Sequence, residues 1–313
     1  MPGTITPATD FSADKDCQEL RNAMKGLGTN ETKIINILGN RSREQRLQIA
    51  LVFKTMYGKD LLMEFKSELS ANFLRLCKCL LFSIPQYLAK ELKRAMKGSG
   101  TDERALVEIL VGLDNRGIAE VKHIYKSMFE AELEREIVSE TSGDFKRLAL
   151  SLLQGNRDEN DVVDKEVAKE DALELFNAGI NRFGTDESKF NSILCARSYR
   201  HLKMVFAEYK MVAGEDIEKS IRSEMSGELE LGFLSIIKRI KNTPTYFAEE
   251  LYKSMKGLGT DDDQLIRIIV WRSEIDLVEI KGAFESLYAK PLRDFIKEDT
   301  SGDFKTLLLT ILK

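Results

Sequence analysis

The sequence predicts an all-α protein that contains four copies of one repeat of about seventy residues. Three observations support this prediction. A glycine-rich loop recurs four times, the apolar residues between the loops follow helical spacing, and only 5 of the 313 residues are proline. A regular internal period overrides the estimate of about two domains that the length alone suggests.

The recurring loop marks the four repeats. Met-Lys-Gly-x-Gly-Thr occurs at residues 24–29, 96–101 and 255–260, and a longer variant, Ala-Gly-Ile-Asn-Arg-Phe-Gly-Thr, occupies residues 178–185. The glycines that precede the four threonines are separated by 72, 84 and 75 residues, so extra residues lie between the second and third repeats. The expected divisions are a tail at 1–12, repeats at 13–83 and 84–155, a polar linker at 156–169, and repeats at 170–241 and 242–313.

Several short helices are expected in each repeat. The spacing i, i+3, i+4, i+7 is followed by Ile49, Val52, Phe53 and Met56, and again by Val121, Ile124, Tyr125 and Met128. Each loop threonine precedes acidic or amide residues, which predicts a helix start capped by the threonine hydroxyl. Ser-Gly-Asp-Phe at 142–145 and 301–304, with looser versions at Ser70 and Ser226, predicts another helix start late in each repeat. Five helices per repeat are therefore expected.

The charge balance excludes one class of partner and restricts another. The formal net charge is −4 and no long run of Lys or Arg is present, so we expect no nucleic-acid binding. A mildly acidic protein is repelled by an anionic membrane leaflet. Lipid binding would therefore require a bridging cation.

The sequence also indicates a location. No stretch approaches the roughly 18 uninterrupted apolar residues of a transmembrane helix. Residues 1–12 lack the basic start and apolar run of a secretory signal, and four irregularly spaced cysteines, at positions 17, 77, 79 and 195, suit structural thiols in a reducing compartment. We therefore expect a cytoplasmic protein whose membrane contact is peripheral.

An acidic residue lies forty positions after the last glycine of every loop. The pairs are Gly28 and Glu68, Gly100 and Glu140, Gly184 and Glu224, and Gly259 and Asp299. Calcium takes six to eight oxygen ligands from carboxylates, backbone carbonyls and water. Glycine allows a loop to turn several carbonyl groups toward one point, and the distant carboxylate would complete the site. With one carboxylate, such a site should be weak until phosphate oxygens of a lipid replace its waters.

A simpler interpretation is that each loop is only a tight turn and each acid only a solvated charge. Four acids in one register favour the calcium interpretation. Two further questions stay open at this stage. Lys25, Lys97 and Lys256 suit either lipid phosphates or helix C-termini, and Leu27 and Leu258 suit either insertion into the membrane interface or local packing.

The loops, the registered acids and the four repeats together resemble those of the annexins, over residues 11–313. The resemblance implies that each repeat is a right-handed bundle of five helices and that the four repeats form a curved disc. It also implies calcium ligands in each repeat: the carbonyls of Met24, Gly26 and Gly28 with Glu68; Met96, Gly98 and Gly100 with Glu140; Gly179, Arg182 and Gly184 with Glu224; and Met255, Gly257 and Gly259 with Asp299.

The same resemblance implies partners. Calcium would attach the protein to acidic phospholipid membranes such as those containing phosphatidylserine, in support of membrane organisation, aggregation or trafficking. Phe183 stands where family members can carry a lipid-inserting Trp. The resemblance also allows homo-oligomers on membranes and release from cells by a non-classical route. Pro2, Gly3 and Pro7 argue against a helical tail that binds small EF-hand proteins.

The sequence gives less support to two other classes of function, an enzyme and a protein-binding scaffold. An enzyme is not expected, because the two histidines lack zinc-binding spacing and no nucleophile elbow or phosphate loop is present. A helical scaffold that binds proteins on a concave face would explain the repeats but not the registered acids. Three repeats carry Arg-Ser, at 41–42, 197–198 and 272–273, whereas the second has Leu113-Asp114, which argues against an ion channel of the annexin type.

Overall fold

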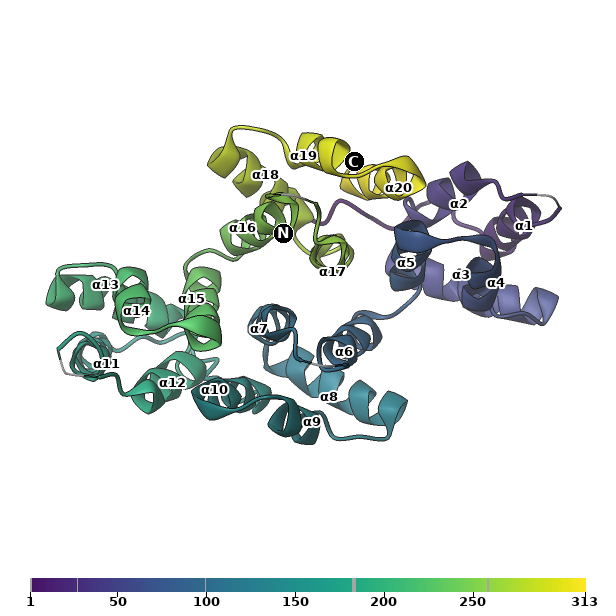
Figure 1. The fold of residues 1–313 in the computed structure, drawn as a ribbon. Helices are drawn as coiled ribbons and strands as arrows, with labels where there is room; N and C mark the ends of the chain where they lie inside the picture. The colour runs from purple at the N-terminus through teal and green to yellow at the C-terminus, as the bar shows by residue number, and fades with distance from the viewer. Residues whose placement is uncertain (1, 27, 99, 182–183, 258) are drawn as a thin grey trace. The chain divides into compact units, whose positions relative to one another are not determined.

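The protein is helical throughout the part of the chain that the structure describes. The structure is a computed structural model, and it describes residues 2–26, 28–98, 100–181, 184–257 and 259–313. Within these residues it contains twenty α-helices and no strand (Figure 1). The helices follow one another in four groups of five, which confirms the all-α class and the four repeats expected from the sequence.

The helix bounds correspond from repeat to repeat. The first group is α1 (Ala13–Ala23), α2 (Glu31–Leu38), α3 (Arg43–Tyr57), α4 (Leu61–Glu68) and α5 (Ala71–Leu80). The second is α6 (Ile84–Ala95), α7 (Glu103–Gly112), α8 (Asn115–Phe129), α9 (Leu133–Glu140) and α10 (Gly143–Leu153). The third is α11 (Lys165–Ala178), α12 (Glu187–Ala196), α13 (Tyr199–Ala213), α14 (Ile217–Glu224) and α15 (Gly227–Lys241). The fourth is α16 (Thr243–Met255), α17 (Asp262–Arg272), α18 (Leu277–Tyr288), α19 (Leu292–Asp299) and α20 (Gly302–Leu312).

The chain forms two compact units. The first compact unit combines the residues up to Tyr87 with Pro244–Lys313, and the second is Leu88–Thr243. The first and fourth repeats thus share one compact unit, in which α2 packs on α20 and α5 packs on α17 and α20. The second and third repeats share the other, in which α7 packs on α15 and α10 packs on α12 and α15. In both units the contact uses the second and fifth helices of each repeat.

Each compact unit has its own apolar core. In the second, Leu175, Phe190, Tyr209 and Phe233 belong to one buried cluster that draws on helices of both repeats. In the first, buried aromatic rings from α3, α4, α16 and α18 include Phe53, Phe65, Phe247 and Phe284. Burial of this apolar surface stabilises helices that are too short to persist alone in water.

The helix that follows each loop begins differently from the sequence prediction. Its cap is the residue after the threonine: Asn30, Asp102, Asp186 or Asp261. In each case the side-chain oxygen accepts a hydrogen bond from the backbone N–H three residues on. The expectation that threonine caps these helices was therefore wrong. Both residue types can cap a helix, and the threonine hydroxyl is engaged elsewhere.

The tail packs against the rest of the first compact unit in a defined conformation, without a helix between residues 2 and 12. The N–H of Ile5 donates to the carbonyl of Ser273 at 3.1 Å, and the Ile5 side chain is buried. Ala8 exchanges two hydrogen bonds, of 3.0 and 2.9 Å, with the side-chain amide of Gln45. A Cβ on Gly3 would lie 2.5 Å from the Ser273 carbonyl oxygen, so this close approach requires glycine.

The sequence predicts that the chain contains no transmembrane helix and that its four cysteines are structural thiols. Among the described residues, none of the helices combines the length and apolar character needed to cross a bilayer. All four cysteines are buried and free. Burial raises the pKa of the Cys17 thiol to about 11 and that of Cys195 to about 12, so both stay protonated and unreactive at neutral pH.

Candidate metal sites in the loops

Glycine conformation shapes the loops of the first, second and fourth repeats. The first glycine has φ of 112° in Gly26, 119° in Gly98 and 123° in Gly257, and the second glycines, at 28, 100 and 259, have φ of 86°, 105° and 88°. A Cβ at any of these positions would meet no atom within 4 Å. Glycine is therefore needed for its backbone freedom rather than for lack of space.

One backbone hydrogen bond closes each loop. It joins Asn30 to Ala23 and Asp102 to Ala95, both at 2.8 Å, and Asp261 to Ser254 at 2.7 Å. In the third repeat the N–H of Asp186 donates to the Ala178 carbonyl at 2.8 Å, so this loop encloses one more residue than the others. The four loops thus have a common closure, with a longer third member.

The loop threonine contacts the distant acid in every repeat. Thr29 donates to the Glu68 carboxylate at 3.1 Å, and Thr260 donates to both the carboxylate and the backbone carbonyl of Asp299. Thr101 and Thr185 donate to the backbone carbonyls of the acids 39 residues later, at 2.9 and 3.4 Å. The structure therefore brings each loop together with the acid that the sequence pairs with it.

Each of these acids is the last residue of the fourth helix in its repeat, the helices α4, α9, α14 and α19. A negative charge at a helix C-terminus is unfavourable by about 0.3–1 kcal/mol because the helix dipole is negative there. Four acids at this unfavourable position indicate a role other than helix stability. A bound cation would relieve the repulsion.

The loop carbonyls have unused acceptor capacity. Among the described residues, no hydrogen bond ends on the carbonyl oxygens of Met24, Gly26 or Gly28, nor on their counterparts at 96, 98, 100, 255, 257 and 259. The three methionine side chains are buried and anchor the start of each loop, while the neighbouring lysines are exposed. Within the described residues no three acidic, histidine or cysteine side chains form a metal-binding group by themselves. A metal ion bound here would therefore take most of its ligands from backbone oxygen, a donor set that suits calcium.

The third loop departs from this geometry at Gly179. This glycine ends α11 with φ of −112° and ψ of −113°, whereas Gly184 has φ of 76°. Only Gly184 therefore resembles the glycines of the other loops. Four residues assigned from the sequence to metal or membrane contact, Leu27, Arg182, Phe183 and Leu258, lie outside the described residues.

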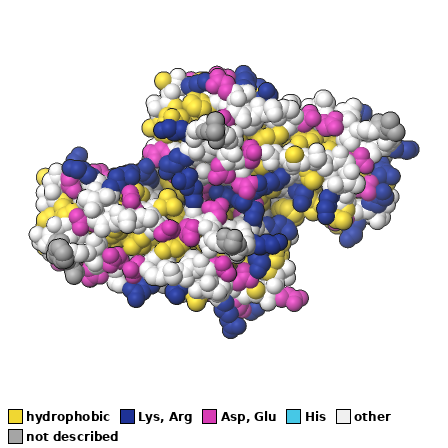
Figure 2. Space-filling model, viewed as in Figure 1, with side chains coloured by type: hydrophobic (Ala, Val, Ile, Leu, Met, Phe, Trp, Pro, Cys, Tyr) yellow, Lys and Arg dark blue, Asp and Glu magenta, His cyan; other side chains and the backbone are white. Residues whose placement is uncertain are grey.

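Near the fourth loop, the carboxyl group of Asp262 has a raised pKa. Partial burial raises the pKa of Asp262, and the negative charges of Asp261 and Asp299 raise it further, against the effects of Asn72 and Arg75. Lys and Arg side chains lie among Asp and Glu side chains on the visible face of the molecule (Figure 2). The sequence gives no sign of this group, because Asn72 and Arg75 come from the first repeat and meet Asp262 only in the folded chain.

Comparison with known proteins decides the family. The family model described as Annexin matches residues 15–80, 87–152, 170–236 and 246–311. The chain belongs to the annexin family. Members of this family generally bind phospholipid in a calcium-dependent manner and are generally not enzymes.

The similarity of this annexin to its relatives extends over nearly all of its length. It is 52% identical to human annexin A11 over 309 residues, which are 99% of this chain and 61% of that protein. It thus spans about three-fifths of annexin A11. Mouse annexin A4 is 48% identical over 309 residues, 99% of this chain and 97% of annexin A4.

Two solved structures extend the comparison. A structure of annexin III matches with a TM-score of 0.97 and 43% identity, covering 100% of this chain and 97% of that one. A structure of calcium-bound annexin (Sm)1 matches with a TM-score of 0.87 and 34% identity, covering 99% and 93%. The annexin fold expected from the sequence is confirmed.

Proposed function

We propose that this annexin attaches to acidic phospholipid membranes through calcium ions held in its loops. The observation that carries the proposal is the contact between each loop threonine and an acid 39 residues later. This contact supports the proposal because, in the first, second and fourth repeats, the loop also has carbonyl oxygens that accept no hydrogen bond among the described residues. The neighbour described as calcium-bound annexin (Sm)1 supports the choice of metal.

The ligands in this proposal are three loop carbonyls and one carboxylate per repeat. They are Met24, Gly26, Gly28 and Glu68; Met96, Gly98, Gly100 and Glu140; Gly179, Arg182, Gly184 and Glu224; and Met255, Gly257, Gly259 and Asp299. Calcium bound there supplies a positive charge that both the protein and an anionic phosphate can share. Since one carboxylate gives weak binding, of the order of 10⁻⁴–10⁻³ M, lipid oxygens in the remaining positions would raise calcium affinity and calcium would raise lipid affinity equally.

The proposal also accounts for the charge of the protein. With a net charge of −4, the protein is on average repelled by a phosphatidylserine membrane, so a bridging cation is required. The exposed lysines at 25, 97 and 256 and the residues Leu27, Phe183 and Leu258 belong to the proposed membrane contact. The protein would act in the cytoplasm as a peripheral organiser of membranes, with copies able to assemble on the lipid surface.

Cosedimentation with vesicles tests this proposal. Vesicles of phosphatidylserine and phosphatidylcholine should pellet the protein in 1 mM calcium, a concentration of about the expected weak-site affinity. A chelator should return the protein to the supernatant. If the protein stays in the supernatant under both conditions, the proposal is wrong.

A matched pair of variants tests the site. The site variant changes Glu68, Glu140, Glu224 and Asp299 to their amides. The control variant makes the same change of charge, one per repeat, at Glu44, Glu120, Glu170 and Asp294, which lie in α3, α8, α11 and α19. The site variant should need at least about tenfold more calcium for half-maximal pelleting, because each site loses its one charged ligand. Equal calcium dependence of the two variants would reject the assigned carboxylates.

A further inference from the structure

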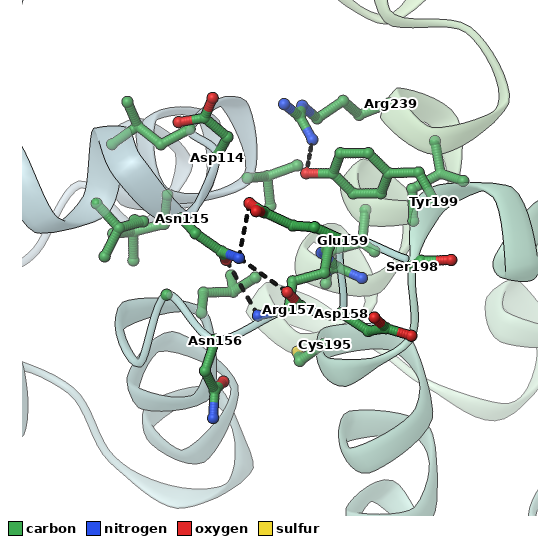
Figure 3. A pocket seen from close by; sticks show the side chains of 18 of the residues that line it. Asp114, Asn115, Asn156, Arg157, Asp158, Glu159, Cys195, Ser198, Tyr199 and Arg239 are labelled. Atoms are coloured by element: carbon green, nitrogen blue, oxygen red, sulfur yellow. Dashed lines mark hydrogen bonds between the residues drawn. The ribbon is translucent and has the colours of Figure 1, made fainter. Parts of the chain in front are cut away.

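The second compact unit contains a cavity that lies outside the loops. It has a volume of about 260 Å³, and one side is formed by Gly155, the linker residues 156–159 and Asp161 (Figure 3). The opposite walls come from the start of α8, the start of α13 and one face of α15. Leu110, Ile118, Leu152 and Ile236 give these walls an apolar character. The cavity therefore combines an apolar body with a polar, linker-covered side.

Two guanidinium groups lie against one aromatic ring in this cavity. The guanidinium carbons of Arg157 and Arg239 are 4.8 and 4.7 Å from the centre of the Tyr199 ring. Arg157 donates to two backbone carbonyls, at 2.6 and 2.8 Å, and Arg239 donates to the Tyr199 hydroxyl and to a backbone carbonyl. All four acceptors are neutral. Burial lowers the pKa of Arg157, and the positive charge of Arg239 lowers it further.

Four carboxylates also line the cavity, but none of them bonds directly to these two arginines. Within the described residues each has a different partner: Asp114 accepts from the N–H of Gly117, Asp158 accepts from the N–H of Asn160, Glu159 accepts from the Asn115 amide, and Asp161 pairs with Arg200. Neither Arg157 nor Arg239 forms a salt bridge in the described part of the chain. The guanidinium groups of Arg157 and Arg239 thus lie in the cavity wall without a directly bonded carboxylate among the described residues.

One donor in the cavity wall is also unused. The Nε–H of Arg239 is buried and has no hydrogen-bond partner among the described residues. A buried donor without an acceptor is unfavourable, and such groups are rare unless a ligand or water satisfies them. Figure 3 shows the Arg239 side chain beside Tyr199 at the edge of the open space. A ligand oxygen that reaches this Nε–H after the neighbouring side chains move would satisfy a donor that has no acceptor among the described residues.

We propose that this cavity binds a small organic anion, a phosphate or carboxylate group carried on an apolar body. The anionic group would accept a hydrogen bond from Arg239 and neutralise the charge shared with Arg157. The apolar body would pack against Ile118, Leu152 and Ile236. This site is separate from the calcium loops, because no proposed calcium ligand lines the cavity. Its ligand is an anion held by guanidinium groups, whereas the loops would hold a cation.

Phenyl phosphate is a suitable probe, since it combines both features. Calorimetry in the presence of a chelator should show phenyl phosphate binding at least about tenfold more tightly than inorganic phosphate or phenol, because each of these lacks one half of the recognition. The chelator removes calcium from the solution, so failure here leaves the membrane proposal untouched. Equal affinity for phenyl phosphate and inorganic phosphate would overturn the proposal.

Amide NMR shifts on the unaltered protein locate the site without any variant. Phenyl phosphate should shift the resonances of residues 155–161 and of the start of α13. Shifts confined to other surfaces would contradict the proposal.

A pair of variants then tests the donor. Arg239→Met should weaken phenyl phosphate binding about tenfold, while Arg222→Met, which removes the same charge from an exposed position in α14, should leave it unchanged. Equal affinities of the two variants would reject Arg239 as the anchor. If Arg239→Met does not fold, the shift map alone decides.

Discussion

The hydroxyl of Thr29 donates a hydrogen bond of 3.1 Å to the carboxylate of Glu68, 39 residues further along the chain. Thr260 makes the same contact with Asp299. In the second and third repeats the acceptor is the backbone carbonyl of the acid instead. The loop threonine thus fixes the end of the fourth helix everywhere, and in the first and fourth repeats it also orients the carboxylate.

We expect Thr29→Val to weaken the first calcium site. Loss of one hydrogen bond of about 0.5–1.5 kcal/mol corresponds to roughly two- to tenfold more calcium for vesicle binding. The measurement requires a background in which Glu140, Glu224 and Asp299 are amides, so that only the first site remains. Thr55→Val is the control, because the Thr55 hydroxyl bonds only the carbonyl of Leu51 within α3. No difference between the two valine variants would contradict the orienting role.

Much of this architecture follows from the sequence, because the repeats present each local signal four times. The glycine loops, the helical spacing and the registered acids predicted the helices and the pairing of loop with acid. The cap was assigned to threonine rather than to Asn30 or Asp102 because local sequence does not show that the hydroxyl bonds a residue 39 positions away. Long-range contacts of this kind need the folded chain.

Other features also lacked a local signal. The sequence of the tail predicts a polar segment, yet the Ile5 side chain is buried and its backbone N–H donates a hydrogen bond to the carbonyl of Ser273. The sequence of the linker predicts an exposed, charged connection, yet the guanidinium group of Arg157 lies against the Tyr199 ring. In both cases the partner residue is distant in sequence and carries no motif of its own.

The position of Glu140 at the end of α9 leads to a second prediction. Glu140→Gln should not lower the unfolding midpoint in the presence of chelator, since it removes a charge that the helix dipole disfavours and Thr101 bonds only the backbone carbonyl. With calcium, the variant should gain less stability than the unaltered protein, because ligand binding stabilises by RT ln(1 + [L]/Kd). Thermal unfolding with and without calcium measures both effects. A large loss of stability in chelator would assign Glu140 a structural role.

The fifth helix of each repeat starts at a residue with positive φ. Glycine occupies this position in three repeats, with φ of 58° at Gly143, 63° at Gly227 and 60° at Gly302, but Ala71 holds φ of 48° in the first. The left-handed conformation costs a residue with a Cβ roughly 1–2 kcal/mol, partly offset by the greater entropy of glycine in the unfolded chain. Ala71→Gly should therefore stabilise the protein by about 0.5–1 kcal/mol.

Urea denaturation measures this change, with Gly143→Ala as the reciprocal variant. Gly143→Ala should destabilise by a similar amount, since no atom lies within 4 Å of the added Cβ and only backbone conformation is at issue. A destabilising Ala71→Gly would show that the alanine methyl group makes contacts that outweigh the conformational cost.

The Glu136 carboxylate should contribute stability that depends on pH. Partial burial raises its pKa, but hydrogen bonds from Lys93 and Tyr125 outweigh this effect and hold the pKa below its ordinary value. A lowered pKa in the folded state gives stability that is fully present above the unfolded pKa and is lost as pH falls through the folded value. Glu136→Gln should therefore lower the free energy of unfolding at pH 7 by about 1 kcal/mol, which urea denaturation measures as a lower midpoint. The difference in stability between the variant and the unaltered protein should shrink in acid. Glu44→Gln, an exposed change in α3, is the control, and a difference that does not vary with pH would contradict the linkage.

The first and third repeats share an ion pair with a buried carboxylate, and the second repeat, which has Leu113, lacks it. Arg41 binds Asp16 through two hydrogen bonds, of 2.6 and 3.0 Å, and Asp16 is only 2% exposed. The third repeat has the same pair in Asp171 and Arg197. In the second repeat the positions 72 residues after Asp16 and Arg41 are Leu88 and Leu113, so both positions are apolar there.

Removal of one partner leaves a buried charge unpaired, whereas replacement of both with apolar residues is often neutral. Asp16→Leu alone should therefore destabilise by about 3 kcal/mol, and Asp16→Leu with Arg41→Leu should recover most of that loss. Urea denaturation of both single variants and the double variant completes the cycle. Additive effects of the two changes would mean that the pair does not act as a unit. A coupling of about 2 kcal/mol or more would show that the leucine pair of the second repeat is an alternative solution to the same packing problem.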